Sequence, residues 1–310
     1  MPMLERIAGN RELKQDLKTA LGSGRIAHSI LLVGEPGCGA GFAARCLAAD
    51  YLYPQGGPHA EAVLKKEDTE CLVLQGEGAS GQIPVKKVRE AREAIQRSAL
   101  STDAAGRVLF IYGAQNLNGT QGSAANALLK IIEEPPEGVL FLLTAPNAAV
   151  VLPTIRSRCA AYTIAPVPAA DCAARLRAER LPAKAADELA FLYEGHIGTA
   201  LKSWNDQTTK AALGMAKTLC GYAAQGDTYR ALALLTKYER DKEGFAALLW
   251  QLDQLCSAVL RRPAYGQEQC GGLTPAGAAK ILNADARARK SLTGNGNLRL
   301  NVAVLAGEIA

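Results

Sequence analysis

A glycine-rich loop that follows a short apolar run constrains the fold of this chain more than any other feature. Residues 30–33 are Ile-Leu-Leu-Val, and residues 34–39 are Gly-Glu-Pro-Gly-Cys-Gly. This is the arrangement of a phosphate-binding P-loop between a buried strand and a helix. In a P-loop that supports ATP hydrolysis, the next two residues are a Lys that reaches the phosphates and a Ser or Thr that holds Mg²⁺. Here they are Ala40 and Gly41. The residues of this degenerate P-loop are Gly34, Gly37, Gly39, Ala40 and Gly41.

A second element that such ATPases require is also missing. They carry acidic residues at the end of a later strand, where these residues help to hold Mg²⁺ and to orient the attacking water. The strand-like run at residues 108–111 is followed by Tyr112 and Gly113, and residues 112–116 contain no carboxylate. Backbone N–H groups of the loop could still hold an anion. The loss of both elements nevertheless predicts an inactive P-loop ATPase fold, with no ATP hydrolysis by this chain alone.

Strand-like and helix-like segments alternate through the first half of the chain. Apolar runs predict strands at 29–33, 71–74, 108–112 and 139–144, and helical spacing predicts helices at 10–22, 43–51, 83–95 and 121–134. Because the strand candidates are continuously apolar, we expect a parallel sheet covered by helices on both faces. Beyond about residue 164 the strand patterns stop. Short helices are expected between 171 and 204, and longer ones at 211–224, 229–238, 244–260, 274–291 and 298–309.

Composition excludes several classes of protein. The net charge of +5 is mild, and no apolar stretch approaches the roughly 18 residues that span a bilayer. The N-terminus lacks the apolar segment of a signal peptide. The eight cysteines include no CxxC pair, so we expect reduced thiols and no zinc site. These observations predict a cytoplasmic protein that does not enter a membrane.

Three further stretches carry a family resemblance. Residues 126–136 are Asn-Ala-Leu-Leu-Lys-Ile-Ile-Glu-Glu-Pro-Pro, residues 152–159 are Leu-Pro-Thr-Ile-Arg-Ser-Arg-Cys, and residues 24–29 are Gly-Arg-Ile-Ala-His-Ser. Together they resemble the clamp-loader branch of the AAA+ ATPases. Since the phosphate Lys and the acidic pair are absent while the Ser-Arg-Cys motif is present, the chain is similar to the delta-prime subunits of bacterial DNA polymerase III. The motif residues are Ser157, Arg158 and Cys159.

The resemblance implies an architecture and a function. It implies an α/β AAA+ domain with a parallel sheet over 1–165, a small helical lid domain over 166–207, and an all-α collar domain for oligomerisation over 208–310. The chain would be a non-hydrolysing stator of the clamp loader in DNA replication, without a cofactor of its own. Its partners would be gamma/tau-type subunits that bind the ATP, a delta-type subunit and, through the complex, the sliding clamp and primer–template DNA. The alternative is a divergent AAA+ ATPase acting in DNA recombination or repair.

The resemblance also implies a role for Arg158. In clamp loaders this arginine projects into the ATP site of a neighbouring subunit, where a guanidinium stabilises charge on the transferring phosphate and raises the rate by about 10³ to 10⁵. A subunit can supply such a finger without binding ATP. The alternative interpretation is that Arg156 and Arg158 are cations at a helix C-terminus, which the helix dipole favours.

The chain departs from the family at several places. Many delta-prime subunits carry a four-cysteine zinc module after the P-loop helix, but here a loop is expected around residues 54–59, and the irregular spacing of Cys46, His59 and Cys71 argues against a metal site. Active AAA+ proteins carry a second arginine in their helical domain, and its position falls near Gly198, so that role is also unfilled here. Thr144 occupies the place of a polar sensor, and we expect its hydroxyl to bond to backbone instead.

Three other groups have simpler interpretations. Glu133 and Glu134 are expected at a helix end, and adjacent helix residues point about 100° apart, which excludes a catalytic carboxylate pair. His28 and His196 have no triad partners in sequence and are expected to pack or cap. Basic residues at 86–92 alternate with acidic ones, as on a solvated helix face.

Overall fold

The computed structural model describes residues 2–78, 81–96, 103–117, 123–294 and 296–309. The chain forms two compact units. The first contains residues 1–179 together with 194–198, and the second contains residues 180–193 together with 199–310. The three-domain division predicted from the sequence, with a separate lid over 166–207, stays a prediction.

A five-stranded parallel sheet forms the centre of the first unit, in the order β2-β3-β4-β1-β5. The strands are β1 (Ser29–Val33), β2 (Cys71–Gln75), β3 (Arg107–Tyr112), β4 (Val139–Ala145) and β5 (Ala160–Thr163). Four of them match the predicted strands closely. β5 was not predicted, because its short Ala-Ala-Tyr-Thr sequence is half exposed at the sheet edge and carries no apolar run.

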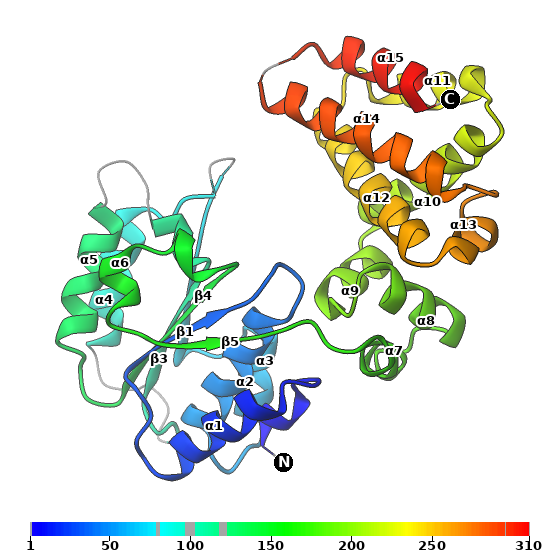
Figure 1. The fold of residues 1–310 in the computed structure, drawn as a ribbon. Coiled ribbons are helices and arrows are strands. Elements are labelled where there is room, and N and C mark those ends of the chain that lie inside the picture. Colours follow the sequence, from blue (N-terminus) through cyan, green and yellow to red (C-terminus); the bar gives the residue numbers. More distant parts are fainter. Residues whose placement is uncertain (1, 79–80, 97–102, 118–122, 295, 310) are drawn as a thin grey trace. The chain divides into compact units, whose positions relative to one another are not determined.

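Helices cover both faces of this sheet (Figure 1). The helical segments of the unit are η1 (Met3–Arg6), α1 (Arg11–Gly22), α2 (Ala40–Leu52), α3 (Pro58–Lys65), α4 (Val85–Ile95), η2 (Ala114–Leu117), α5 (Ser123–Glu133), η4 (Ala148–Val150), α6 (Pro153–Arg156) and α7 (Ala169–Ala178). α1, α2 and α3 pack on one face, and α4, α5 and α6 on the other. The loop expected around 54–59 is wrong in part, since α3 begins at Pro58, a residue type that suits the first helical position.

The middle strand β4 shows why continuous apolar runs predicted this architecture. All of its residues are buried. Leu140 and Leu142 point into the core beneath α2, whereas Phe141 and Leu143 point into the core beneath α4 and α5. Successive side chains of a strand point to opposite faces, so a strand buried on both sides must be apolar throughout. The predicted parallel sheet with two covered faces is confirmed.

The second unit contains helices and, among its described residues, no strand. Its elements are α8 (Ala183–Leu192), α9 (Ile197–Asn205, from Thr199 onward), α10 (Gln207–Ala224), α11 (Thr228–Leu235), η5 (Thr236–Tyr238), α12 (Lys242–Arg261), α13 (Pro263–Gln269), α14 (Pro275–Thr293) and α15 (Leu298–Ile309). α12 lies at the centre and packs on α10 and α14. Asp206, Asp227 and Asp241 cap α10, α11 and α12 by accepting a backbone N–H three residues ahead. The short α13 was not predicted.

The thiols lie inside the fold. Every cysteine except the half-buried Cys159 is buried. Cys46 and Cys71 belong to the core beneath α2, and burial raises the pKa of each thiol to about 12. His59 stacks on the ring of Tyr53, with 5.4 Å between ring centroids. Within the described ranges, no three His, Cys, Asp or Glu side chains gather as a metal site.

None of the helices in the described part of the chain is both long and apolar enough to cross a bilayer.

Candidate functional site

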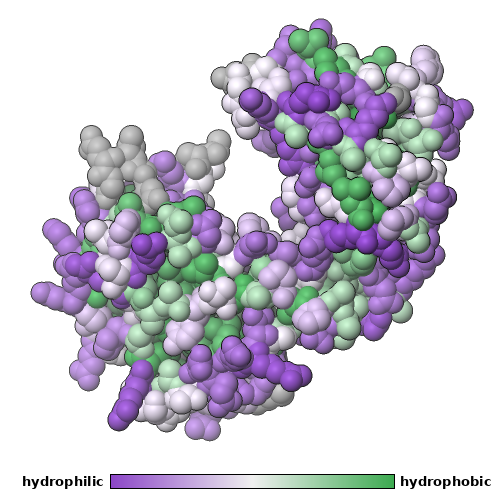
Figure 2. All heavy atoms as spheres, in the orientation of Figure 1, coloured by the Kyte–Doolittle hydropathy of each residue, from purple (hydrophilic) through white to green (hydrophobic). Residues whose placement is uncertain are grey.

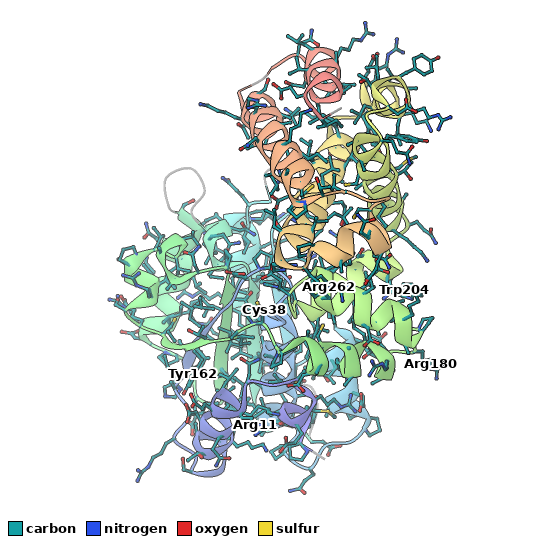
Figure 3. The ribbon with its side chains drawn as sticks, turned by 45° about the vertical axis from the view of Figure 1, so that its right-hand side comes forward. Arg11, Cys38, Tyr162, Arg180, Trp204 and Arg262 are labelled. Atoms are coloured by element: carbon teal, nitrogen blue, oxygen red, sulfur yellow. The ribbon has the colours of Figure 1, made fainter. Side chains whose placement is uncertain are left out.

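The glycine-rich loop joins β1 to α2. Cys38 lies in this loop, and Tyr162 lies on the edge strand β5 of the same sheet (Figure 3). Gly37 and Gly39 have φ of 96° and 101°, in the left-handed region that glycine adopts without strain. Gly39 precedes the first residue of α2, and its carbonyl accepts the first helical hydrogen bond from Ala43 N–H at 2.8 Å. Ala40 therefore begins the helix.

The ring of Tyr112 lies directly over Gly41. A Cβ atom built on Gly41 would lie 2.6 Å from Cε2 of Tyr112, well inside van der Waals contact. The tyrosine is the last residue of β3 and is 49% exposed. Its ring packs edge-on against Phe110, at 6.0 Å between centroids and 82° between planes. The two positions that lack catalytic residues in the sequence are thus neighbours in space.

Thr144 connects two strand ends beside this site. Its Oγ1 accepts a hydrogen bond from the Gly113 N–H at 3.1 Å, and the bond is buried. The expectation that this hydroxyl bonds to backbone is confirmed. The bond fixes the turn after β3 against the end of β4, and so fixes the backbone that carries Tyr112.

Residues 194–198, which belong to the same unit, contact the loop on another side. The Gly198 N–H donates to the Gly37 carbonyl at 2.8 Å. His196 Nε2 lies 3.0 Å from Oε2 of Glu35, a pair that is ionic only when the imidazole is protonated. The backbone of Gly198 therefore contacts the glycine-rich loop directly. His196 packs against the loop, as expected for a residue without triad partners.

Arg158 lies on the surface beside α5 and α6. Its Nη2 is 2.7 Å from Oε1 of Glu133, and its Nη1 donates to the Thr154 carbonyl at 2.9 Å. The guanidinium is therefore held at the end of α6 and stays accessible, with 39% of its side chain exposed. Both sequence interpretations agree with this position, because an accessible cation at a helix end can also reach a neighbouring molecule.

The other two members of the Ser-Arg-Cys motif have different surroundings. Ser157 is exposed, and its hydroxyl donates to the Thr154 carbonyl at 3.2 Å. Cys159 is half-buried, and burial raises the pKa of its thiol to about 11. The motif thus presents Arg158 to solvent between a capping hydroxyl and a packed thiol.

The structure brings the predicted site residues together in two groups. The first is the loop with Tyr112 and Gly113, and the second is the Ser-Arg-Cys motif with Glu133. Glu133 was expected only as a helix-terminal surface group, and it does end α5. Its pairing with Arg158 was missed, because the two residues are far apart in sequence and no local spacing rule relates them.

Comparison with known proteins decides the family. The sequence model of the family "DNA polymerase III, delta subunit" matches residues 9–168, about half of the chain. The chain belongs to this family. The match covers the glycine-rich loop, Tyr112 and the Ser-Arg-Cys motif, and so confirms the resemblance to the clamp-loader branch of the AAA+ proteins.

Relatives of this family member carry two kinds of name. "DNA polymerase III subunit delta'" of Escherichia coli is 28% identical over 272 residues, which is 85% of this chain and 75% of the relative. The delta' subunit of Pseudomonas aeruginosa is 32% identical over 58% of this chain and 56% of its own length. "DNA polymerase III subunit gamma/tau" of Mycobacterium bovis is 33% identical over 49% of this chain, but the match spans only 27% of that relative.

One solved structure is also similar to this chain. The gamma subunit-related protein from Thermotoga maritima aligns with a TM-score of 0.47 and 17% identity, over 95% of this chain and 99% of that one. The chain, a member of the DNA polymerase III delta-subunit family by its sequence, has a parallel-sheet domain and a helical C-terminal region.

Proposed function

We propose that this chain is the non-hydrolysing stator subunit of the DNA polymerase III clamp loader, the complex that loads the sliding clamp onto primed DNA in replication. In this proposal Arg158 enters the ATP site of a neighbouring gamma/tau-type subunit. The observation that carries the proposal is the contrast between the two groups of site residues. The ring of Tyr112 lies over Gly41, just after the chain's own loop, whereas Arg158 is accessible at the surface.

The residues at and after the glycine-rich loop argue against hydrolysis by the chain itself. Phosphoryl transfer on a P-loop needs a Lys, a Mg²⁺ ligand and an acidic residue, because catalysis there is positioning and charge stabilisation. Ala40, Gly41 and Tyr112 offer a methyl group, a hydrogen atom and a phenol. Enzymatic activity would belong to the assembly, as a subunit of a DNA-directed DNA polymerase holoenzyme, with ATP bound by the neighbours. We infer no cofactor, and no zinc, for this chain.

The accessible guanidinium supports the finger role. An arginine is suited to a phosphate because its planar fork offers several N–H donors and keeps its charge at any physiological pH. Arg158 already makes its local contacts through Nη1 to Thr154 and Nη2 to Glu133. These contacts direct the group without burying it, so a phosphate from another subunit could reach its exposed side while Glu133 holds it in place.

The C-terminal helix supports assembly with other subunits. One side of α15 is buried in the unit, through Val302, Leu305 and Ile309. The opposite side is also uncharged, since Leu300, Ala303, Val304 and Gly307 are exposed there. Their i, i+3, i+4, i+7 spacing is that of a helix-packing stripe, and Figure 2 shows hydrophobic residues at the surface over α15. We call these four residues the α15 stripe. The α15 stripe suits a contact in the collar with gamma/tau-type or delta-type subunits. In this proposal the chain acts in the cytoplasm, and it meets the sliding clamp and primer–template DNA only as part of the assembled complex.

The test is ATP hydrolysis by a reconstituted clamp loader in the presence of clamp and primed DNA. Arg158→Ala should lower hydrolysis at the one ATP site that this arginine serves by about 10³-fold, and so lower the rate of the whole complex, with assembly intact by size-exclusion chromatography. Arg156→Ala is the matched control, because Arg156 is a neighbouring surface arginine that donates to the Ala148 carbonyl at 3.4 Å. An unchanged rate for Arg158→Ala would refute the finger. ATP hydrolysis by the purified chain alone would instead favour the divergent ATPase.

A further inference from the structure

In a P-loop enzyme, the residues at the positions of Gly41 and Tyr112 act on the same Mg²⁺ ion. The Ser or Thr that follows the P-loop Lys holds Mg²⁺, and the acidic residue at the later strand end holds or orients the same ion. In this chain the two positions still face each other. Measured from a Cβ built on Gly41, the Cε2, Cδ2 and Cζ atoms of Tyr112 lie at 2.6, 3.3 and 3.7 Å. The aromatic ring therefore occupies the space between them.

The backbone that carries the ring is fixed. Tyr112 pairs with Gln75 of β2 in the sheet, and the next residue, Gly113, donates to Thr144 at 3.1 Å. Phe110 supports the ring edge-on from the fully buried core. The ring consequently projects from the strand end over the first turn of α2, and Tyr112 is 49% exposed.

The other end of the loop is also in contact with the chain. A Cβ on Gly198 would lie 3.1 Å from the Gly37 carbonyl oxygen and 3.3 Å from its Cα, so the backbones approach closely. The Gly198 N–H donates to that carbonyl. His196 adds its contact with Glu35. The loop is thus contacted at Glu35 and Gly37 by residues 196–198, and at Gly41 by the ring.

We propose that Tyr112 excludes Mg²⁺-nucleotide from the glycine-rich loop by filling the volume over Gly41. The proposal rests on the proposed non-hydrolysing function and adds its physical cause. The two sequence losses are then coupled: Gly at position 41 leaves room for the ring, and the ring takes the place of the ion and its phosphates. Restoring the Lys and the Thr would not be enough to recover nucleotide binding.

The binding test uses the loop-restored variant Ala40→Lys/Gly41→Thr in the full chain, titrated with a fluorescent ATP analogue and Mg²⁺. It is combined with Tyr112→Ala, which removes the ring, or with Tyr112→Phe, the matched control that keeps it. We expect binding to be at least about tenfold tighter with Tyr112→Ala than with Tyr112→Phe or Tyr112, a difference of about 1.4 kcal/mol or more. If the Tyr112→Ala combination binds no better than the Tyr112→Phe combination, the proposal is wrong.

A stability cycle tests the contact without any ligand. Gly41→Ala should lower the denaturant midpoint of the wild-type chain, because its methyl group meets the ring. In the Tyr112→Ala background the same change should raise the midpoint, since Ala favours a helix over Gly. Equal shifts in both backgrounds would overturn the coupling. ATP hydrolysis by the unaltered chain would refute the proposed function itself, so the two failures are distinguishable.

Discussion

The guanidinium of Arg158 lies 2.7 Å from a carboxylate oxygen of Glu133. This ion pair connects the last residue of α5 to the segment that directly follows α6. Both side chains are partly exposed, at 39% and 47%. Exposed ion pairs contribute only about 0–1 kcal/mol to stability. The pair therefore matters less for the stability of the fold than for the direction in which Arg158 points.

Glu133→Gln should separate these two effects. We expect the free energy of unfolding to change by less than about 1 kcal/mol. ATP hydrolysis by the reconstituted clamp loader should fall, by about tenfold or less, because the arginine is less well positioned. Glu134→Gln is the control, since Glu134 is the adjacent exposed carboxylate. Equal rates for the two variants would show that Glu133 does not position the finger.

A buried ion pair should be far more important for stability. Arg107 Nε lies 2.9 Å from Oε2 of Glu70, and the Glu70 side chain is fully buried. Arg107→Met leaves that carboxylate without its cation, so we expect a loss of about 3–5 kcal/mol in unfolding free energy. The double change Glu70→Leu/Arg107→Met should recover most of it, because no lone charge is then buried.

The matched control for this pair is exposed. Arg6 and Glu61 form an ion pair whose side chains are 41% and 40% exposed. Arg6→Met should change the unfolding free energy by less than about 1 kcal/mol. Urea unfolding followed by circular dichroism measures all three variants. Similar losses for Arg107→Met and Arg6→Met would contradict the assigned role of burial.

The α15 stripe makes assembly testable. Val304→Glu places a charge in the middle of the exposed apolar face, where a partner helix would have to bury it. We expect the variant to fold with an unchanged circular dichroism spectrum and to bind gamma/tau-type subunits at least about tenfold more weakly. Ala279→Glu, at an exposed position of α14, should not weaken binding. Equal binding by both variants would exclude the stripe from the interface.

Asp285 predicts a pH dependence of stability. Burial raises the pKa of this carboxyl from 3.8 to about 6, with nearby Asp253 adding to the rise and Arg289 opposing it. The folded chain therefore binds this proton more tightly than the unfolded chain. Its contribution to stability falls as the pH rises from about 4 to about 6 and is constant above that.

Asp285→Asn isolates this contribution, because the amide does not titrate. The unfolding free energy of the wild type minus that of the variant should decrease between about pH 4 and pH 6 and then level off. Guanidinium unfolding at a series of pH values measures the difference. A difference that is flat, or that increases with pH, would show that the carboxyl is not held protonated by burial.

Much of the fold was predictable because its signals are local. The continuous apolar run of β4 predicted a doubly covered strand, and the helical spacing of residues 83–95 predicted α4. β5 escaped prediction since an edge strand needs no apolar run, and its pairing with β1 is decided by tertiary contact. α3 and α13 were not predicted, because each is short and offers little helical periodicity in the sequence.

The site was predictable in its residues but not in its contacts. The sequence predicted that Gly41 and Tyr112 lack catalytic groups, yet gave no sign that they touch. The hydrogen bond of the Thr144 hydroxyl to backbone was predicted, because a chain that binds no ATP offers this hydroxyl no phosphate as a partner. The contacts of Glu133 and His196 depend on residues far away in sequence, which periodicity does not detect.

The buried thiols allow local opening of this chain to be measured by chemical labelling. A thiol reagent reaches a buried cysteine only when the surrounding structure opens, so its labelling rate measures the free energy of that opening. Cys46 and Cys71 lie in the core of the first unit, and Cys220 and Cys256 lie in that of the second. Mass spectrometry of labelled peptides would therefore give the labelling rate of each unit separately. The measurement can be made on the isolated chain and on the assembly, without introducing a further cysteine.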